Sequence, residues 1–192
     1  MPHKFPVERR AALIDPDRSR VLGPDKVISL LPIEPDHTVM DVGCGNGFFS
    51  FPLAGYLAQG RLYAVDMQDG MLQDIRDRVA AENIGNIEVV LSRESDIPLP
   101  KEGLNGVFSA FMFHETQDQA GFLRLLKRLL KPGGWLAVLE WHKREMESGP
   151  PVSERIAEEE CLGLLEAAGF MLASRPYLSE EHYVFIVRRP AP

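Results

Sequence analysis

Short apolar runs alternate with amphipathic segments along most of the chain. The apolar runs predict buried strands over Thr38–Val42, Arg61–Asp66, Ile87–Leu91, 106–111 and 135–140. The amphipathic segments predict helices over 25–31, 48–58, 70–82 and 118–130. Strands that alternate with helices of this length need right-handed crossovers. The pattern therefore predicts a parallel sheet with helices on both faces.

The end of the chain breaks this alternation. A helix is predicted over 153–168, where Gly169 ends it, and two strand-like runs follow at 170–177 and 182–189. The short polar loop 178–181 joins the two runs, which predicts a hairpin. The expected fold is an α/β, doubly wound, mostly parallel sheet of seven strands with an antiparallel C-terminal hairpin. A ligand crevice is expected at the carboxyl ends of the parallel strands.

Polar residues and prolines dominate the beginning of the chain, so residues 1–24 are predicted to form an arm, with a short helix over Val7–Ile14. The length of 192 residues suits one buried core, and we predict a single domain over 1–192. The loop 143–152 is the place where a lid could form. The strand at 182–189 is predicted to lie at the sheet edge, where pairing with a second copy would give a homodimer.

The charge balance argues against a nucleic-acid partner. Lys and Arg number 21 against 28 Asp and Glu, and a net charge of −7 is the wrong sign for a polyphosphate-binding surface. With only Cys44 and Cys161, neither a disulfide framework nor a Cys/His metal site is expected. No signal-peptide core or membrane-length apolar stretch is found. We expect a cytoplasmic protein with no membrane span and no metal.

A glycine-rich segment follows the first predicted strand and opens the next helix. It contains Asp41, Gly43, Gly45 and Gly47. Glycines at alternate positions let the backbone turn tightly and approach a ligand closely, although a purely structural turn is the alternative. The spacing is GxGxG and not the GxGxxG of dinucleotide-binding proteins. Asp41 stands just before the first glycine, where an acid suits a cationic ligand better than a pyrophosphate.

Asp66 ends the second predicted strand, at the distance from the glycines where an acid accepts hydrogen bonds from a ribose diol. The expected ligand therefore contains a ribose. The alternative is that Asp66 caps the following helix, although Asp69 is also available for that role.

Five segments together resemble the class I S-adenosylmethionine-dependent methyltransferases, with most similarity to the branch of the ubiquinone/menaquinone C-methyltransferases. They read DVGCGNG, AVDMQ, SRESDIPLP, VFSAFMFHE and LKPGGWLAVLEW, in this order, and the resemblance covers about residues 25–189. It implies a Rossmann-like methyltransferase fold and S-adenosyl-L-methionine as the cofactor.

The resemblance also implies roles for single residues. Asp41 would face the methionine amine, and Gly43, Gly45 and Gly47 would leave room for the methionine and ribose. Asp66 would hold the ribose hydroxyls, Met67 would pack on the adenine, and Phe111 would lie beside the methionine and the reacting methyl group. The chain departs from the family where Arg93 replaces the Asp that commonly meets the adenine amino group. Glu94 or Asp96 would then substitute, or main-chain groups alone would make this contact.

His114 is the candidate catalytic residue, because it follows an apolar strand at the expected crevice and its ordinary pKa is near 6.5. It would act as a general base for a carbon or oxygen acceptor, with Glu115 and His142 as alternative bases. The competing interpretation is that His114 only shapes the pocket or caps the next helix. Trp141 is predicted either to line the pocket or to be covered by the loop after it.

The acceptor is predicted to be a small molecule. The chain lacks the Asn/Asp-Pro-Pro-Tyr/Phe string that many amino-group methyltransferases keep after the fourth strand, and little sequence lies beyond the core. A quinone-like or other apolar aromatic acceptor is preferred. The alternatives are a non-catalytic module that binds S-adenosylmethionine or its demethylated product, and an NAD-dependent oxidoreductase.

Overall fold

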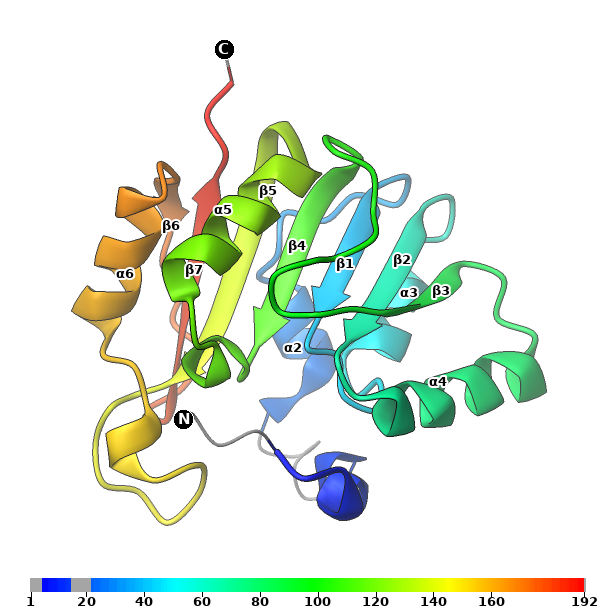
Figure 1. Ribbon diagram of the computed structural model, residues 1–192, viewed down its shortest axis with the longest axis horizontal. Helices are drawn as coiled ribbons and strands as arrows, with labels where there is room; N and C mark the ends of the chain where they lie inside the picture. Colours follow the sequence, from blue (N-terminus) through cyan, green and yellow to red (C-terminus); the bar gives the residue numbers. More distant parts are fainter. Residues whose placement is uncertain (1–4, 15–21, 192) are drawn as a thin grey trace.

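A seven-stranded sheet in the order β3-β2-β1-β4-β5-β7-β6 crosses the molecule (Figure 1). The computed structural model describes residues 5–14 and 22–191. The strands are β1 (Thr38–Val42), β2 (Arg61–Asp66), β3 (Ile87–Leu91), β4 (Leu104–Ala110), β5 (Leu130–Trp141), β6 (Met171–Ser174) and β7 (His182–Arg188). The first five strands are parallel, and β7 pairs antiparallel with both β5 and β6. The predicted mixed, doubly wound fold is confirmed.

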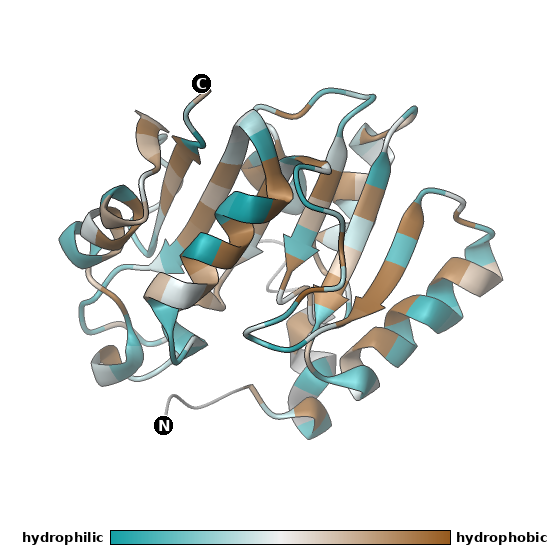
Figure 2. Ribbon diagram, turned by 45° about the horizontal axis from the view of Figure 1, so that its top comes forward, coloured by the Kyte–Doolittle hydropathy of each residue, from teal (hydrophilic) through white to brown (hydrophobic). Residues whose placement is uncertain are grey.

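Helices cover both faces of the sheet. One face packs against α2 (Pro24–Ile28), α3 (Ser50–Tyr56) and α4 (Asp69–Glu82), and the other against α5 (Gln119–Leu129) and α6 (Glu158–Ala167). Figure 2 shows the result for α4 and α5, whose apolar side faces the strands while the polar side faces outward. In α5, for example, Leu123 and Leu126 are buried, whereas Arg124 is exposed. Burial of these apolar stripes is what holds the layers together.

Several predicted boundaries are wrong, two of them for identifiable reasons. The fourth strand ends at Ala110, because Phe111 has a left-handed backbone with φ of +58° and cannot continue an extended strand. The helix predicted over 153–168 is divided into a short 3-10 turn, Val152–Glu154, and the α6 helix. Between them Arg155 and Ala157 are extended, with ψ of 147° and 151°. The predicted run at 170–177 also shortens to β6.

The prediction about the sheet edge is wrong as well. The strand β7 lies between β5 and β6 and is hydrogen-bonded on both sides. It therefore offers no free edge to a second copy of the chain. The edge strand at this end is β6, where Met171 and Leu172 are exposed.

The segment Val7–Ile14 forms a 3-10 helix, which agrees with the predicted short helix. It lies across the carboxyl ends of the strands, near the start of α4 (Figure 1). The parts of the predicted arm at residues 1–4 and 15–21 lie outside the described residues. No helix among the described residues combines the length and the apolar character that a membrane crossing requires.

Candidate functional site

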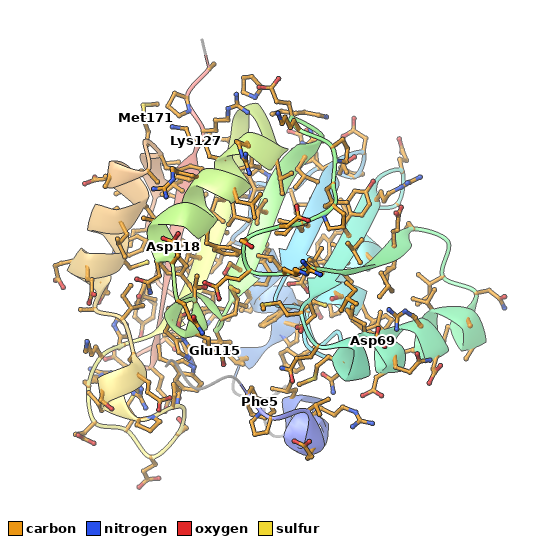
Figure 3. The ribbon with its side chains drawn as sticks, in the orientation of Figure 1. Phe5, Asp69, Glu115, Asp118, Lys127 and Met171 are labelled. Carbon is orange, nitrogen blue, oxygen red and sulfur yellow. The ribbon has the colours of Figure 1, made fainter. Side chains whose placement is uncertain are left out.

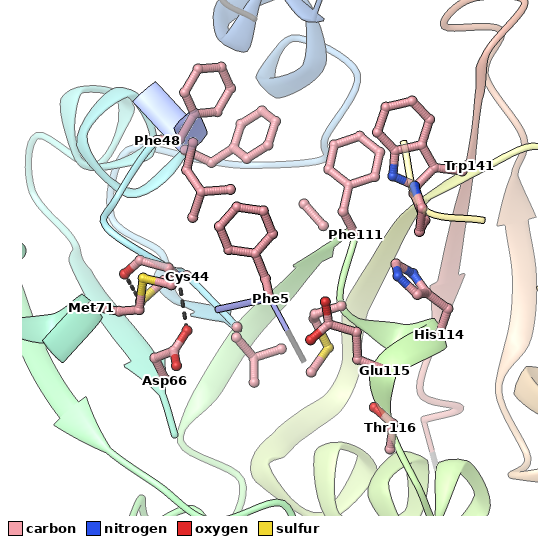
Figure 4. Close-up of a pocket in the computed structure, with 18 of the residues that line it drawn as sticks. Phe5, Cys44, Phe48, Asp66, Met71, Phe111, His114, Glu115, Thr116 and Trp141 are labelled. Atoms are coloured by element: carbon pink, nitrogen blue, oxygen red, sulfur yellow. Dashed lines mark hydrogen bonds between the residues drawn. The ribbon is translucent and has the colours of Figure 1, made fainter. Parts of the chain in front are cut away.

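A cavity of about 920 Å³ opens at the carboxyl ends of β1, β2, β4 and β5, where the fold predicts a ligand crevice. Its lining comes from the glycine-rich turn after β1, the residues that follow β2 and β4, the loop after β5, and the N-terminal segment. Figure 4 shows these walls, with Phe5 between Cys44 and Phe111. Almost all candidate site residues therefore meet at one place.

The glycine-rich turn requires glycine both because of its backbone conformation and because neighbouring side chains leave no room for a Cβ atom. Gly43, Gly45 and Gly47 have φ of +70°, +55° and +91°, a region that other residues rarely adopt. A Cβ on Gly43 would lie 2.6 Å from Met112 Cγ, and one on Gly47 would lie 2.6 Å from the Phe51 ring. The N–H of Gly43 donates to the Val65 carbonyl at 2.8 Å, which bonds the turn to β2. Gly43 and Gly45 line the cavity.

Asp66 connects the turn with the end of β2. One carboxylate oxygen accepts the Gly45 N–H at 2.9 Å and the other accepts the Gln68 N–H at 2.8 Å (Figure 4). Gln68 is the N-cap residue of α4, so the capping interpretation of Asp66 is partly right. A carboxylate has about four acceptor positions, so each oxygen of Asp66 can accept more than one hydrogen bond.

Asp41 is 2% exposed and lies beneath the glycine-rich turn. Its pKa is raised to about 7, chiefly by burial and in smaller part by the charge of Asp66, against the lowering effect of the hydrogen bond from Ser50 Oγ at 2.6 Å. Among the described residues no basic side chain forms an ion pair with Asp41. A cationic ligand would therefore find a carboxyl that ionises when the ligand arrives.

Only some of the residues that were expected to contact the adenine line the cavity. Met67 and Glu94 line it, whereas Asp96 does not. Oε1 of Glu94 accepts the N–H groups of Gln117 and Asp118 at 2.8 and 2.9 Å, which ties it to the start of α5. Arg93 and Asp96 pair through their main chains in a tight turn, and the Asp96 side chain is exposed.

His114 forms a buried pair with Glu140 at the end of β5. The Nδ1 atom of His114 lies 2.9 Å from both carboxylate oxygens, and the His114 N–H donates to Oε1 at 3.1 Å. The side chain of Glu140 is fully buried and that of His114 is 6% exposed. Burial lowers the pKa of His114, but the hydrogen bond and the charge of Glu140 outweigh it, so the pKa is raised overall. This pairing sets the imidazole orientation at the cavity wall.

The two alternative bases differ in position. Glu115 lines the cavity, and burial raises its pKa. His142 is not among the lining residues, because its Nδ1 pairs with Glu158 at 2.9 Å on the other side of the loop. The structure therefore brings His114 and Glu115, but not His142, to the cavity wall.

Aromatic side chains form the wall next to His114. Phe111 and Trp141 have ring centroids 5.1 Å apart, and the Trp141 ring lies 4.3 Å from that of His182. All three line the cavity, as does Phe48. Trp141 is thus a pocket residue, which was one of its two predicted places. Phe113 is 1% exposed and belongs to the core.

The N-terminal segment covers the mouth of the cavity. Gln68 Nε2 donates to the Phe5 carbonyl at 3.0 Å, and Asn46 Nδ2 donates to the Arg10 carbonyl at 2.8 Å. Arg10 also pairs with Asp74 of α4 at 2.7 Å. The segment is therefore attached to the glycine-rich turn and to the residues that follow β2.

Sequence reasoning missed Glu140, Asn46, Gln68 and Phe5. Glu140 had a signal, because an acid inside the apolar run LAVLEW must find a partner when it is buried. Asn46 has a buried Oδ1 without a hydrogen-bond partner among the described residues, in the lining of the cavity. Contacts made by the N-terminal segment had no signal in the sequence.

The fold and this site define the class I S-adenosylmethionine-dependent methyltransferases. Residues 39–134 match the family model described as "Methyltransferase domain". The chain belongs to this family.

Named relatives agree with this placement. The chain is 29% identical over 159 residues to the ubiquinone/menaquinone biosynthesis C-methyltransferase UbiE of Marinomonas sp., covering 80% of this chain and 62% of that one. It is 27% identical over 116 residues to a demethylmenaquinone methyltransferase of Listeria monocytogenes, covering 60% and 49%. The chain thus spans about half to three fifths of these relatives.

A solved structure matches over a larger share of both chains. A SAM-dependent methyltransferase from Aquifex aeolicus is 33% identical, with a TM-score of 0.93 and coverage of 97% of this chain and 100% of that chain. Phosphoethanolamine N-methyltransferase 2 of Haemonchus contortus, in complex with S-adenosyl-L-methionine, has a TM-score of 0.72 at 15% identity. The second likeness concerns the fold alone.

The donor set of the cavity fits S-adenosylmethionine. The buried Asp41 carboxyl has no basic side chain beside it among the described residues, and Asp66 places a carboxylate in the lining at the end of β2. The Asn46 Oδ1 atom is a buried acceptor without a partner in the described part of the chain. These groups match an ammonium, a ribose and a polar ligand edge. The glycine-rich turn brings the main chain to the same place.

Proposed function

We propose that the protein transfers the methyl group of S-adenosylmethionine to a small aromatic acceptor, with the His114–Glu140 pair as the proton acceptor. The observation that carries this proposal is the buried contact of 2.9 Å between His114 Nδ1 and Glu140, with His114 in the wall of a cavity of about 920 Å³. An imidazole oriented by a carboxylate is the arrangement that general-base catalysis requires.

The residues at the cofactor end would hold S-adenosylmethionine. Asp41 would pair with the amine, Asp66 would accept the ribose hydroxyls, and Met67 and Glu94 would meet the adenine. Gly43 and Gly45 would leave room for the methionine, and Phe111 would lie next to the methyl group. The bound cofactor supplies a methyl group that is already activated on a sulfonium, so the protein chiefly has to align the acceptor and exclude water.

His114 would hold the proton that the acceptor loses. Its Nδ1 is occupied by Glu140, which leaves Nε2 for the acceptor. Glu140 stabilises the imidazolium that forms and so raises the pKa of His114. A phenolic or enolic hydroxyl is a suitable acceptor group, because deprotonation makes its oxygen, and the ring carbon next to it, more nucleophilic.

The lining of the acceptor end supports a planar aromatic acceptor. Phe111 and Trp141 offer apolar faces for stacking, and Phe48 adds a third ring to the lining. The relatives named above as quinone C-methyltransferases support the same class. We therefore propose a hydroquinone or a related hydroxylated ring as the acceptor.

The test is a methyl-transfer assay with S-adenosylmethionine and a panel of 1,4-naphthoquinol, 1,4-hydroquinone and catechol. The expected result is S-adenosylhomocysteine formation and a product heavier by one CH₂ group. His114→Gln is expected to lower kcat by on the order of 100-fold without weakening cofactor binding. Glu140→Gln is expected to move the acidic limb of the kcat profile to lower pH, because it lowers the pKa of His114. Cofactor binding without turnover on any acceptor would favour a non-catalytic binding module.

Two further expectations stay predictions. The first is a cytoplasmic location, which is supported by Cys44 and Cys161 being free thiols. The second is a homodimer. Pairing at the hairpin end of the sheet would use β6, where Met171 is 58% exposed and Leu172 is 44% exposed. Light scattering of Leu172→Lys against the unmodified protein would test it. A dimer that persists in this variant contradicts pairing through β6.

A further inference from the structure

We infer that Arg155 is a positioning residue for the acceptor. It holds the loop after β5 in one conformation against Trp141, and Gly149 allows the loop to approach the indole ring closely. The inference rests on the proposed function, because it concerns the acceptor end of the same cavity. It begins from an unusual feature, a buried arginine with no acidic partner.

Arg155 is 3% exposed, and no carboxylate among the described residues lies within ion-pair distance of it. Its guanidinium instead donates to main-chain carbonyl oxygens. The acceptors are Pro150 O at 2.8 Å from Nε, His142 O at 3.2 Å and Arg144 O at 2.8 Å from Nη1, and Ser148 O at 2.7 Å from Nη2. One side chain therefore closes the whole loop from residue 142 to residue 150.

Such a loop has few other means of holding its shape. It forms no helix or strand between the end of β5 and Val152. Its main-chain carbonyls must find donors when they are buried, and Arg155 supplies them from a single planar group. A lysine ammonium is a point charge with three donors and cannot reach four carbonyls in this fan-shaped arrangement.

The loop is pressed against Trp141. Gly149 has φ of +87°, and a Cβ added there would lie 2.9 Å from the Trp141 atoms Cδ2 and Cε3. The Arg155 guanidinium lies 5.6 Å from the Trp141 ring centroid, within the range of a cation–π contact. His182 lies 4.3 Å from the indole ring. Trp141 is thus held between the loop and His182.

The same loop lines the cavity. Residues 147–151 belong to its wall, and Gly149 contacts Trp141 there. The loop lies on the opposite side of the strand ends from β2 and α4 (Figure 1). The cofactor end is built by β1 and β2 and the turns after them. A change in the loop is therefore expected to affect the acceptor and not S-adenosylmethionine.

The main test compares Arg155→Lys with Arg61→Lys. Arg61 is exposed and pairs with the exposed Glu88 of β3, away from the loop, so its variant controls for the loss of one guanidinium. Lys143 and Arg144 lie in the loop and are trypsin sites. Arg155→Lys is expected to speed native-state cleavage there by on the order of tenfold, since loops open locally when their hydrogen bonds are lost. Arg61→Lys is expected to leave the rate unchanged.

The second readout is ligand binding. Titration with 1,4-naphthoquinone, followed by quenching of tryptophan fluorescence, is expected to give a Kd about tenfold weaker in Arg155→Lys. Calorimetry is expected to show an unchanged Kd for S-adenosylmethionine. Gly149→Ala, which keeps Arg155, is expected to weaken naphthoquinone in the same way while melting within a few degrees of the parent.

The outcomes separate the two proposals. An unchanged cleavage rate in Arg155→Lys overturns the inference, and so does equal weakening of both ligands. If the parent protein does not bind naphthoquinone, the proposed acceptor class fails, and the cleavage rate together with the Trp141 emission of Gly149→Ala decides the inference. Faster cleavage with a shifted emission then supports it.

Discussion

The Gly45 N–H donates to a carboxylate oxygen of Asp66 at 2.9 Å, so the glycine-rich turn and the acid at the end of β2 form one unit. The second oxygen accepts the Gln68 N–H at 2.8 Å. Both oxygens of Asp66 must therefore accept hydrogen bonds. The carboxylate holds the main chain of the site in place in addition to any contact with a ligand.

Asp66→Asn tests this double role. The new amide NH₂ would face one of the two N–H donors, which leaves a buried donor without an acceptor. We expect the free energy of unfolding to fall by about 1–3 kcal/mol and S-adenosylmethionine binding to weaken at least about tenfold. Denaturant titration and calorimetry measure the two effects. Asp69→Asn, at an exposed surface pair with Arg76, is the control and is expected to change neither.

Asp41→Asn is expected to stabilise the ligand-free protein while it weakens cofactor binding. Folding raises the pKa of Asp41 from 3.8 to about 7. The stability contributed by this carboxyl is complete below pH 3.8 and is lost as the pH rises through 7. The ionised form therefore costs stability at pH 8, and the neutral amide removes this cost.

The pH dependence of stability and of S-adenosylmethionine binding distinguishes Asp41 from the other carboxyl groups. Melting curves are expected to show a larger gain for Asp41→Asn at pH 8 than at pH 5. S-adenosylmethionine is expected to bind the parent more weakly as the pH falls below 7, because the carboxyl must lose a proton to pair with the amine. An equally steep pH dependence in Asp41→Asn would contradict the assignment. Asp36→Asn, at an exposed site, is the matched control.

Removal of residues 1–14 tests the cover over the cavity. No described residue of this segment belongs to either apolar cluster of the core, so the truncated chain is expected to keep its fold. Cofactor dissociation is expected to be on the order of tenfold faster, because contacts with Asn46, Gln68 and Asp74 hold the segment over the site. Stopped-flow displacement measures the rate. The exposed Glu8→Gln is a control, and an unchanged rate in the truncated chain would rule out a covering role.

Gly106→Ala is expected to be strongly destabilising. Gly106 and Trp135 are cross-strand neighbours on β4 and β5, and a Cβ on Gly106 would lie 2.0 Å from Trp135 Cε2. The indole is 1% exposed and has no space to move into, so the expected loss is about 3 kcal/mol. Gly163→Ala in α6 is the contrast. A Cβ there meets nothing within 4 Å, and we expect a gain of about 0.5–1 kcal/mol. Thermal unfolding of the two variants compares them.

The layers and their order could be predicted because period and composition are local signals. Val39 and Leu62 are buried in runs that read as strands, and the order of strands and helices fixed the parallel part of the sheet. The position of β7 could not be predicted, because which strand occupies an edge depends on pairing between segments far apart in the chain. For the same reason the antiparallel pairing of the last two strands was predicted correctly, whereas the strand that lies at the sheet edge was not.

The site divides in a similar way. Asp41, Asp66 and the glycines could be predicted because they follow strand ends in a fixed pattern. Glu140 and Arg155 could not be assigned roles, because their partners are distant side chains and carbonyl groups. The left-handed backbone of Phe111 had no signal either, since the surrounding structure imposes that conformation on an aromatic residue.

The course of the two ends of the described chain has a practical consequence for any fusion protein. Phe5 lines the cavity, whereas Met171 of β6 lies at the opposite end of the strands (Figure 3). The strand β7 ends at Arg188, paired with Met171 and Trp135, and the chain continues from that opposite end (Figure 1). Immobilisation through the C-terminal side would therefore leave the cavity facing the solution.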